Sequence, residues 1–351
     1  MDTNTSQSRR EAASQARRKV NIKFVHEPSF FEKKDEAEKE EFFKQERVRS
    51  LRVRRSRAIL RRITLGVGIT IACAVSILAI VPVFYTFLNS FMSSAEISHN
   101  YGVIFQSLSG HVQQGASYLA ETPRMTVVPQ RVTIEQYKNL LLMSPTYLLK
   151  FWNSIILVVP IVVGQMAVSC LAAYSFARYR RKRREVLFFS YIILMLMPFQ
   201  VTLVPNYIMN EALNILDTPL AVILPGIFST FSVYILTKYM RRIPKAYIEA
   251  AIIDGAGEWQ IFTKVVMPNC KAPVAAMAIL LFIDYWNMVE QPLVMIQDEG
   301  MQPLSVFLSK VNVENIGLAF AACALYMIPP LLIFLRGEDQ LVEGISQSGI
   351  K

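Results

Sequence analysis

Charged residues are scarce in this chain. Asp, Glu, Lys and Arg make up only 18% of its 351 residues, while 53% of the residues are hydrophobic. About a quarter of the residues in an ordinary soluble domain are charged, so this composition excludes that class. The net charge of +10 is concentrated in short blocks that alternate with long apolar runs.

Cysteine and histidine are also few, and they are scattered along the chain. The residues concerned are Cys73, Cys170, Cys270, Cys323, His26, His99 and His111. Four cysteines in a chain of this length are too few for a disulfide-based fold. No spacing among the cysteines and histidines resembles a metal site. We therefore predict no metal centre, no bound cofactor and no histidine-based catalysis.

Several functional motifs are missing. The Gly-x-x-x-x-Gly-Lys-Ser/Thr loop that holds nucleotide phosphates does not occur, so this chain cannot hold ATP as a cassette ATPase does. No combination of nucleophile, base and orienting group indicates an enzyme. We also find no internal repeat and no spread of ionisable residues over several apolar runs, which an ATP-independent secondary transporter would show.

What the chain does contain is six long apolar stretches. They cover residues 63–91, 151–176, 186–205, 218–237, 272–296 and 316–335. Each has about the 20 residues that a helix needs to cross the hydrocarbon layer. The runs are continuous rather than alternating, which favours helices over the strands of a barrel. We predict an all-α polytopic membrane protein with six transmembrane helices in a domain of residues 63–337.

Every predicted span contains proline, which removes a backbone hydrogen bond and permits a kink. These prolines are Pro82, Pro160, Pro198, Pro225, Pro292 and the pair Pro329 and Pro330.

The basic blocks predict the orientation. Lys and Arg gather in residues 47–62, 178–184 and 238–245, which fall on one side of a six-span arrangement. Residues 204–217 and 297–315, on the other side, contain one Lys between them. Because cytoplasmic loops are enriched in Lys and Arg, we predict that both termini are cytoplasmic in a plasma membrane protein.

The terminal and outer segments follow from that orientation. Residues 1–62 form a charged cytoplasmic arm, either a solvated helix or tail or a surface helix drawn to anionic lipid. No nucleic-acid-binding module accompanies its charge. Residues 92–150 form an extracellular segment suited to an outside partner, with a short helix at 133–142 capped by Thr133. Residues 338–351 form a cytoplasmic tail.

The long loop at residues 238–271 is the most informative segment. Pro244 suits a helix start, and residues 246–253 are a good helical run. Gly255 suits the left-handed turn that ends a helix. A second helix is predicted over residues 258–267, stopping at Pro268. The loop should therefore be a cytoplasmic helix-turn-helix.

The loop carries a spaced motif. Three residues separate Glu249, Ala250 and Ala251 from Gly255, and nine more separate Gly255 from Val265, which is followed by Met267 and Pro268. This pattern resembles the signature of the membrane permease subunits of type I ATP-binding cassette (ABC) importers. The resemblance implies ATPase coupling through Glu249, Ala250, Ala251, Asp254, Gly255 and Pro268. It also implies two separate ATPase subunits, a homologous second permease and an extracellular solute-binding protein. The alternative is an ordinary interfacial helix with a glycine cap.

Further segments narrow the resemblance to carbohydrate importers of the maltose type from bacteria. They are residues 132–137, Phe151 to Ser154, Trp286 and Asn287 with Pro292 and Leu293, Gln302 to Leu304, and Leu341 to Gly344. The resemblance implies transport of a carbohydrate, and of an oligosaccharide in particular, by alternating access. A permease for a non-sugar solute remains the alternative.

The fifth span is the best candidate to line the path. Asp284 lies about 18 Å along it, and a charge at that depth should face the bundle interior or water. We predict that Asp284, Asn287 and Gln291 share one helical face, with Tyr285 and Trp286 beside them, and bind sugar hydroxyls. The alternative is a hydrogen bond between helices without sugar contact.

Overall fold

The computed structural model describes residues 36–100, 126–310 and 316–349, apart from 98, 127 and 180. Within these ranges the chain is helical, and an isolated bridge pairs Met92 with Val132. The predicted all-α class is therefore confirmed. The chain divides into two units, Met1–Val81 and Pro82–Lys351. The start of the N-terminal arm, His26 and His111 lie outside the described residues.

Helix α3 (Glu36–Asn89) begins in the first unit. Its part from Arg62 to Asn89 is long and apolar enough to cross a membrane, in agreement with the first predicted span. The charged arm is helical from Glu36 onward. In the second unit, the hydroxyl of Thr86 donates a hydrogen bond of 2.9 Å to the carbonyl of Pro82, so the helical turn that follows this proline has an additional hydrogen bond.

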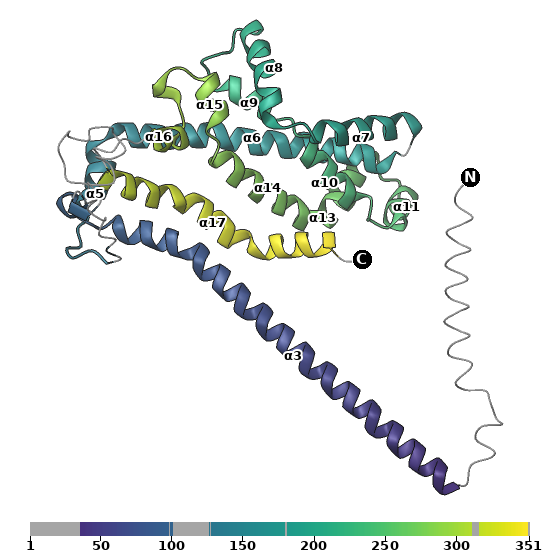
Figure 1. The fold of residues 1–351 in the computed structure, drawn as a ribbon. Helices are drawn as coiled ribbons and strands as arrows, with labels where there is room; N and C mark the ends of the chain where they lie inside the picture. The colour runs from purple at the N-terminus through teal and green to yellow at the C-terminus, as the bar shows by residue number, and fades with distance from the viewer. Residues whose placement is uncertain are drawn as a thin grey trace. The chain divides into compact units, whose positions relative to one another are not determined.

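Helix α6 (Pro145–Arg178) is central to the second unit. It begins before the predicted residue 151 because Pro145 has the fixed φ that suits a first helical turn. It packs against α10 (Thr230–Met240) and α14 (Lys271–Trp286), and α14 packs in turn against α17 (Ile316–Gly349). Figure 1 shows α6, α14 and α17 running through this unit.

The short outer helix predicted at residues 133–142 is also present. Its α-helical part, α5, covers Glu135–Lys138, and a π-helix, η1, continues over Asn139–Met143. Ile134 occupies the cap position, so the predicted cap is wrong by one residue. The hydroxyl of Thr133 nevertheless accepts the backbone N–H of Glu135 at 3.1 Å.

The third predicted span is not one continuous helix. Helix α7 (Lys182–Met195) and helix α8 (Phe199–Ala212) meet at an angle of 104°. Pro198 lies at this break, lacks a backbone donor and disfavours helical geometry in the residue before it. The fourth predicted span contains α9 (Leu220–Gly226) and α10 with three residues between them, and Leu220–Met240 as a whole is long and apolar enough to cross a membrane.

The fifth predicted span, residues 272–296, is wrong as a continuous helix. Helix α14 ends at Trp286, and α15 (Glu290–Met295) begins after three residues outside the helices. Pro292 could not donate the hydrogen bond that an unbroken helix requires at its position. The carbonyl of Met288 instead accepts a hydrogen bond of 2.6 Å from the hydroxyl of Ser305, so the break is satisfied by another segment.

The last helix, α17, runs beyond the predicted span end at residue 335 and includes most of the predicted tail. Glycines allow it to approach α14 closely. A Cβ atom on Gly337 would lie 2.0 Å from Cδ1 of Ile279, and one on Gly344 would lie 3.0 Å from Cβ of Ala276. The hydroxyl of Tyr239 donates to the carbonyl of Gly344. The part of the predicted tail up to Gly344 is therefore packed onto the bundle.

Within the described residues, four helices are long and apolar enough to cross a membrane. Two bent pairs, α7 with α8 and the helical run Glu258–Asn269 with α14, raise the number to as many as six if each pair is one span. The structure thus agrees with a multi-span membrane protein, while the count of six depends on the bent pairs.

We expect Gly337→Leu to destabilise the protein by about 1–3 kcal/mol, because the added side chain must displace Ile279 in a packed interface. Gly66→Leu is the matched control, since a Cβ there meets nothing within 4 Å. Thermal unfolding of the detergent-solubilised protein measures both. Equal melting temperatures for the two variants would contradict the close packing of α17 on α14.

Candidate functional site

The loop after α10 folds as two helical arms joined by a tight turn. The first arm, α11 (Lys245–Ile253), confirms the predicted helix to within a residue. Gly255 has φ of +79°, in the left-handed region that favours glycine, and confirms the predicted turn. Ala256 then donates its N–H to the carbonyl of Ala251 at 2.9 Å, which closes the turn.

The second arm consists of α12 (Glu258–Gln260), the π-helix η2 (Ile261–Val266) and α13 (Met267–Asn269). The prediction that Pro268 stops this helix is wrong. Pro268 lies within the uninterrupted helical run Glu258–Asn269, which ends where the N–H of Cys270 donates to the carbonyl of Met267 at 3.1 Å.

The signature residues lie mainly on the surface of the loop. Glu249, Ala250, Asp254, Gly255 and Pro268 are exposed, and Ala251 is half-buried. Large apolar side chains are exposed beside them: the exposed fraction is 86% for Ile253 and 66% for Trp259. Exposed apolar groups of this size mark interaction surfaces. Ile253 and Trp259 were not predicted as functional residues, although two large apolar residues that flank a turn in a charged loop are a usable sequence signal.

The second arm fixes the loop to the bundle. Ile261, Phe262 and Val266 of η2 are buried in one cluster with Cys170 and Ala173 of α6 and with Leu236 and Met240 of α10. At the start of this arm, the carboxylate of Glu258 accepts a hydrogen bond of 2.5 Å from the hydroxyl of Tyr174. Its other oxygen lies 3.4 Å from the guanidinium of Arg178.

Most of the predicted path residues come together around a cavity, but they do not lie on one helical face. Asp284, Tyr285, Asn287 and Gln291 line one cavity of about 500 Å³. The shared helical face is wrong, because α14 ends before Asn287 and Gln291 belongs to α15. The break in the helix brings these groups together. The remaining lining residues are Phe199, Met288, Val289 and Glu290.

Trp286 does not line this cavity. Its ring is 1% exposed, stacks on Phe282 and Tyr326 at centroid distances of 5.4 and 5.6 Å, and donates its N–H to the carbonyl of Tyr326. It is therefore a core residue in this structure and offers no free face for stacking. The hydroxyl of Tyr285 donates to the carbonyl of Gly226 at 3.1 Å, so its polar end is also engaged.

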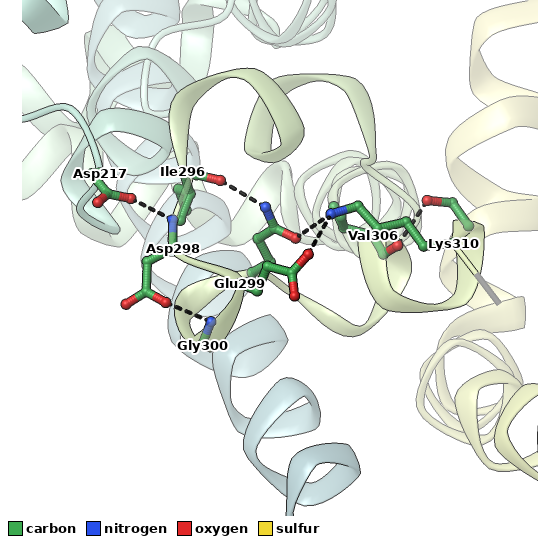
Figure 2. A network of polar contacts seen from close by, with 9 residues as sticks. Asp217, Ile296, Asp298, Glu299, Gly300, Val306 and Lys310 are labelled. Carbon is green, nitrogen blue, oxygen red and sulfur yellow. Dashed lines mark hydrogen bonds and ion pairs between the residues drawn. The ribbon is translucent and has the colours of Figure 1, made fainter. Parts of the chain in front are cut away.

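A polar network organises the predicted outer end of the bundle (Figure 2). One oxygen of Asp217 accepts the N–H groups of Gln297 and Asp298 at 2.9 and 2.8 Å. The ammonium of Lys310 contacts Glu299 at 3.4 Å and the side chain of Gln302 at 3.1 Å. These contacts involve the turn just before α9, which contains Asp217, the 3-10 helix η3 (Glu299–Met301), and Lys310 at the end of α16 (Leu304–Ser309).

Two motifs that are distant in sequence meet at this network. The amide of Asn153 donates to the carbonyls of Gly300 and Gln302 at 2.6 and 3.2 Å. The hydroxyl of Ser154 accepts the N–H of Leu304 at 2.9 Å. The start of the second predicted span thus holds the turn after the fifth. Within the described part of the chain, no group of three or more His, Cys, Asp or Glu residues could hold a metal ion.

The family described as binding-protein-dependent transport system inner membrane component matches residues 165–346, which include the loop and the cavity. The chain belongs to this family. It is a permease subunit of a transport system and an inner membrane component.

Characterised relatives of this permease transport several solutes. This permease is 28% identical over 226 residues to an arabinooligosaccharide transport permease of Halalkalibacterium halodurans. The match covers 64% of this chain and 81% of the relative. This permease is 28% identical over 200 residues to a lactose transport permease of Rhizobium radiobacter, covering 56% and 73%. An sn-glycerol-3-phosphate transport permease of Salmonella choleraesuis is 28% identical over 238 residues, covering 65% and 84%.

The fold is shared with a solved ABC importer. A chain from the crystal structure of a bacterial ABC transporter that imports the acidic polysaccharide alginate matches with a TM-score of 0.63 at 22% identity. The match covers 79% of this permease and 96% of that chain. The expected ABC importer permease fold is thereby confirmed.

We expect Gly255→Val to loosen the turn of the loop by about 1–2 kcal/mol, because a side chain at positive φ clashes with its own backbone. Gly257→Val is the control, since Gly257 has φ of −72° and open space around it. Hydrogen–deuterium exchange of the α11 amides should accelerate only in the Gly255 variant. Equal exchange in both variants would contradict a structural role for the left-handed turn.

Proposed function

We propose that this permease belongs to an ATP-driven importer that moves a carbohydrate, an oligosaccharide in particular, across the bacterial plasma membrane by alternating access. Membership of the binding-protein-dependent family and the arabinooligosaccharide and lactose relatives support the proposal. The orientation has both termini in the cytoplasm, as the basic blocks favour. The observation that carries the proposal is the exposed loop of α11 and its glycine turn within the region that matches the family.

The loop is the coupling element in this proposal. Two separate ATPase subunits lie beneath two permeases, and this loop docks on the ATPase side. The second permease completes the path, and an extracellular solute-binding protein delivers the solute. Glu249 offers an exposed carboxylate, and Ala250 and Ala251 allow close approach of a partner. Asp254, Gly255 and Pro268 complete the surface. ATP hydrolysis occurs on the partner chains, and this permease responds to their movement.

The cavity at the break between α14 and α15 is the solute path. Asp284 and Glu290 offer carboxylates, and Asn287 and Gln291 offer amides. These groups pair with hydroxyl groups. The described lining residues include no Lys or Arg, so carboxylate or phosphate groups on a solute would be repelled. The cavity therefore favours neutral sugars, in contrast to the glycerol phosphate and alginate that relatives import.

Reversal of charge tests the coupling role. Glu249→Lys should reduce uptake by at least about tenfold, because a like charge replaces one partner of an interface pair. Glu211→Lys, another exposed carboxylate on α8, is the control and should leave uptake normal. Uptake of labelled sugar and co-purification of the ATPase subunits are measured in a strain without another copy. Normal uptake by the Glu249 variant would remove the loop from coupling.

Removal of a carboxylate tests the path. Asp284→Ala should lower the rate of neutral oligosaccharide uptake at saturating solute by about tenfold, because it removes a charged hydrogen-bond acceptor. Asp284→Lys should shift uptake from neutral towards uronate-containing oligosaccharides. Asp339→Ala on α17, an exposed carboxylate outside the cavity lining, is the control. Unchanged rate and unchanged selectivity in both Asp284 variants would contradict a path role.

A further inference from the structure

A cavity lies between the first arm of the loop and α6. This cavity of about 280 Å³ is lined by Ile248 and Glu249 from α11 and by Tyr174, Ala177 and Arg178 from α6. Protein interiors transmit displacement because they are close-packed.

The second arm, by contrast, is joined directly to α6. Tyr174 and Arg178 lie one turn apart on α6, so they face the same neighbour. Both contact Glu258, at 2.5 and 3.4 Å. The ring of Tyr174 also lies 5.2 Å from the ring of Phe262, and the Phe262 ring lies 5.4 Å from that of Trp259. The second arm is thus bound to α6 by both polar and aromatic contacts.

The two arms are packed on each other. Helix α11 contacts η2, and Ile248, Ala251 and Ala256 pack against the cluster that contains Ile261 and Phe262. A displacement of α11 therefore has a continuous packed route to η2 and α12. From there it reaches α6 through the polar contacts of Glu258 with Tyr174 and Arg178, which lie beside the apolar cluster that η2 shares with α6.

We propose that Glu258, held by Tyr174 and Arg178, is the junction through which movement of the coupling loop enters helix α6. Glu258 is a positioning residue for transport, and it acts on α6 rather than on the ATPase or on the solute. The inference rests on the proposed function, because it requires an ATPase that moves the loop. It predicts that loss of the junction separates ATP hydrolysis from solute movement.

A second ion pair on the same side of the bundle provides a matched control. Arg241 lies 2.8 Å from Glu185, and its guanidinium also donates to the carbonyl of Phe176. This pair connects α10 with α7 and includes no residue of either arm of the loop. Glu185→Gln therefore removes an ion pair of similar exposure without touching the junction.

The test uses the complete transporter in proteoliposomes, with neutral oligosaccharide uptake and ATP hydrolysis measured in the same vesicles. The variants are Glu258→Gln, Tyr174→Phe, their double variant and Glu185→Gln. Glu258→Gln should reduce the solute transported per ATP hydrolysed by about tenfold, because it weakens hydrogen bonds to a charged group. Tyr174→Phe should act in the same direction, and the double variant should be no worse than Glu258→Gln, since both remove one interaction. Glu185→Gln should leave the ratio unchanged.

Three results would contradict the proposal that Glu258 is the junction. They are an unchanged ratio in Glu258→Gln, additive losses in the double variant, and loss of ATPase subunits from the Glu258→Gln complex, which would make Glu258 an assembly residue. Failure of the proposed function gives a different pattern, because sugar uptake by the unmodified transporter would then not require ATP. The conservative Tyr174→Phe variant keeps the ring contact with Phe262 and so tests the junction even if Glu258→Gln folds poorly.

Discussion

Pairing of backbone groups at helix breaks is the constraint on which this structure depends. A carbonyl released in an apolar bundle has no water to bind, so another part of the protein must supply a donor. Side chains from other segments supply these donors. The hydroxyls of Tyr326, Ser305 and Tyr285 donate to the carbonyls of Trp286, Met288 and Gly226, respectively. These bonds allow α14 to end early and leave polar side chains around a cavity.

The coupling loop and the cavity occupy opposite ends of the same helix. The second arm of the loop leads directly into α14 at Lys271, and the cavity lies where α14 ends, at Trp286. Along its length α14 packs on α6 and α17, and glycines keep the contact with α17 close. The bundle therefore packs α14 against both α6 and α17 over the stretch between the loop and the cavity.

The sequence predicted the parts of this arrangement that depend on local pattern. Apolar length gave the membrane helices, and the glycine at residue 255 indicated the left-handed turn that the structure contains. The breaks were missed because they depend on partners far along the chain, such as Ser305 for Met288. Trp286 was misplaced for the same reason, since its burial requires Tyr326 of α17. The contact between Glu258 and Tyr174 could not be predicted either, because only folding brings these two residues together.

The measurement that tests the central claim most directly is uptake of a labelled solute panel in cells with and without this chain. The panel contains neutral mono- and oligosaccharides, uronate-containing oligosaccharides, glycerol phosphate, amino acids and peptides. Our account predicts that deletion abolishes uptake of one class of neutral sugar and that restoring the chain restores it. Loss confined to amino acids, peptides or anionic solutes would contradict the carbohydrate assignment.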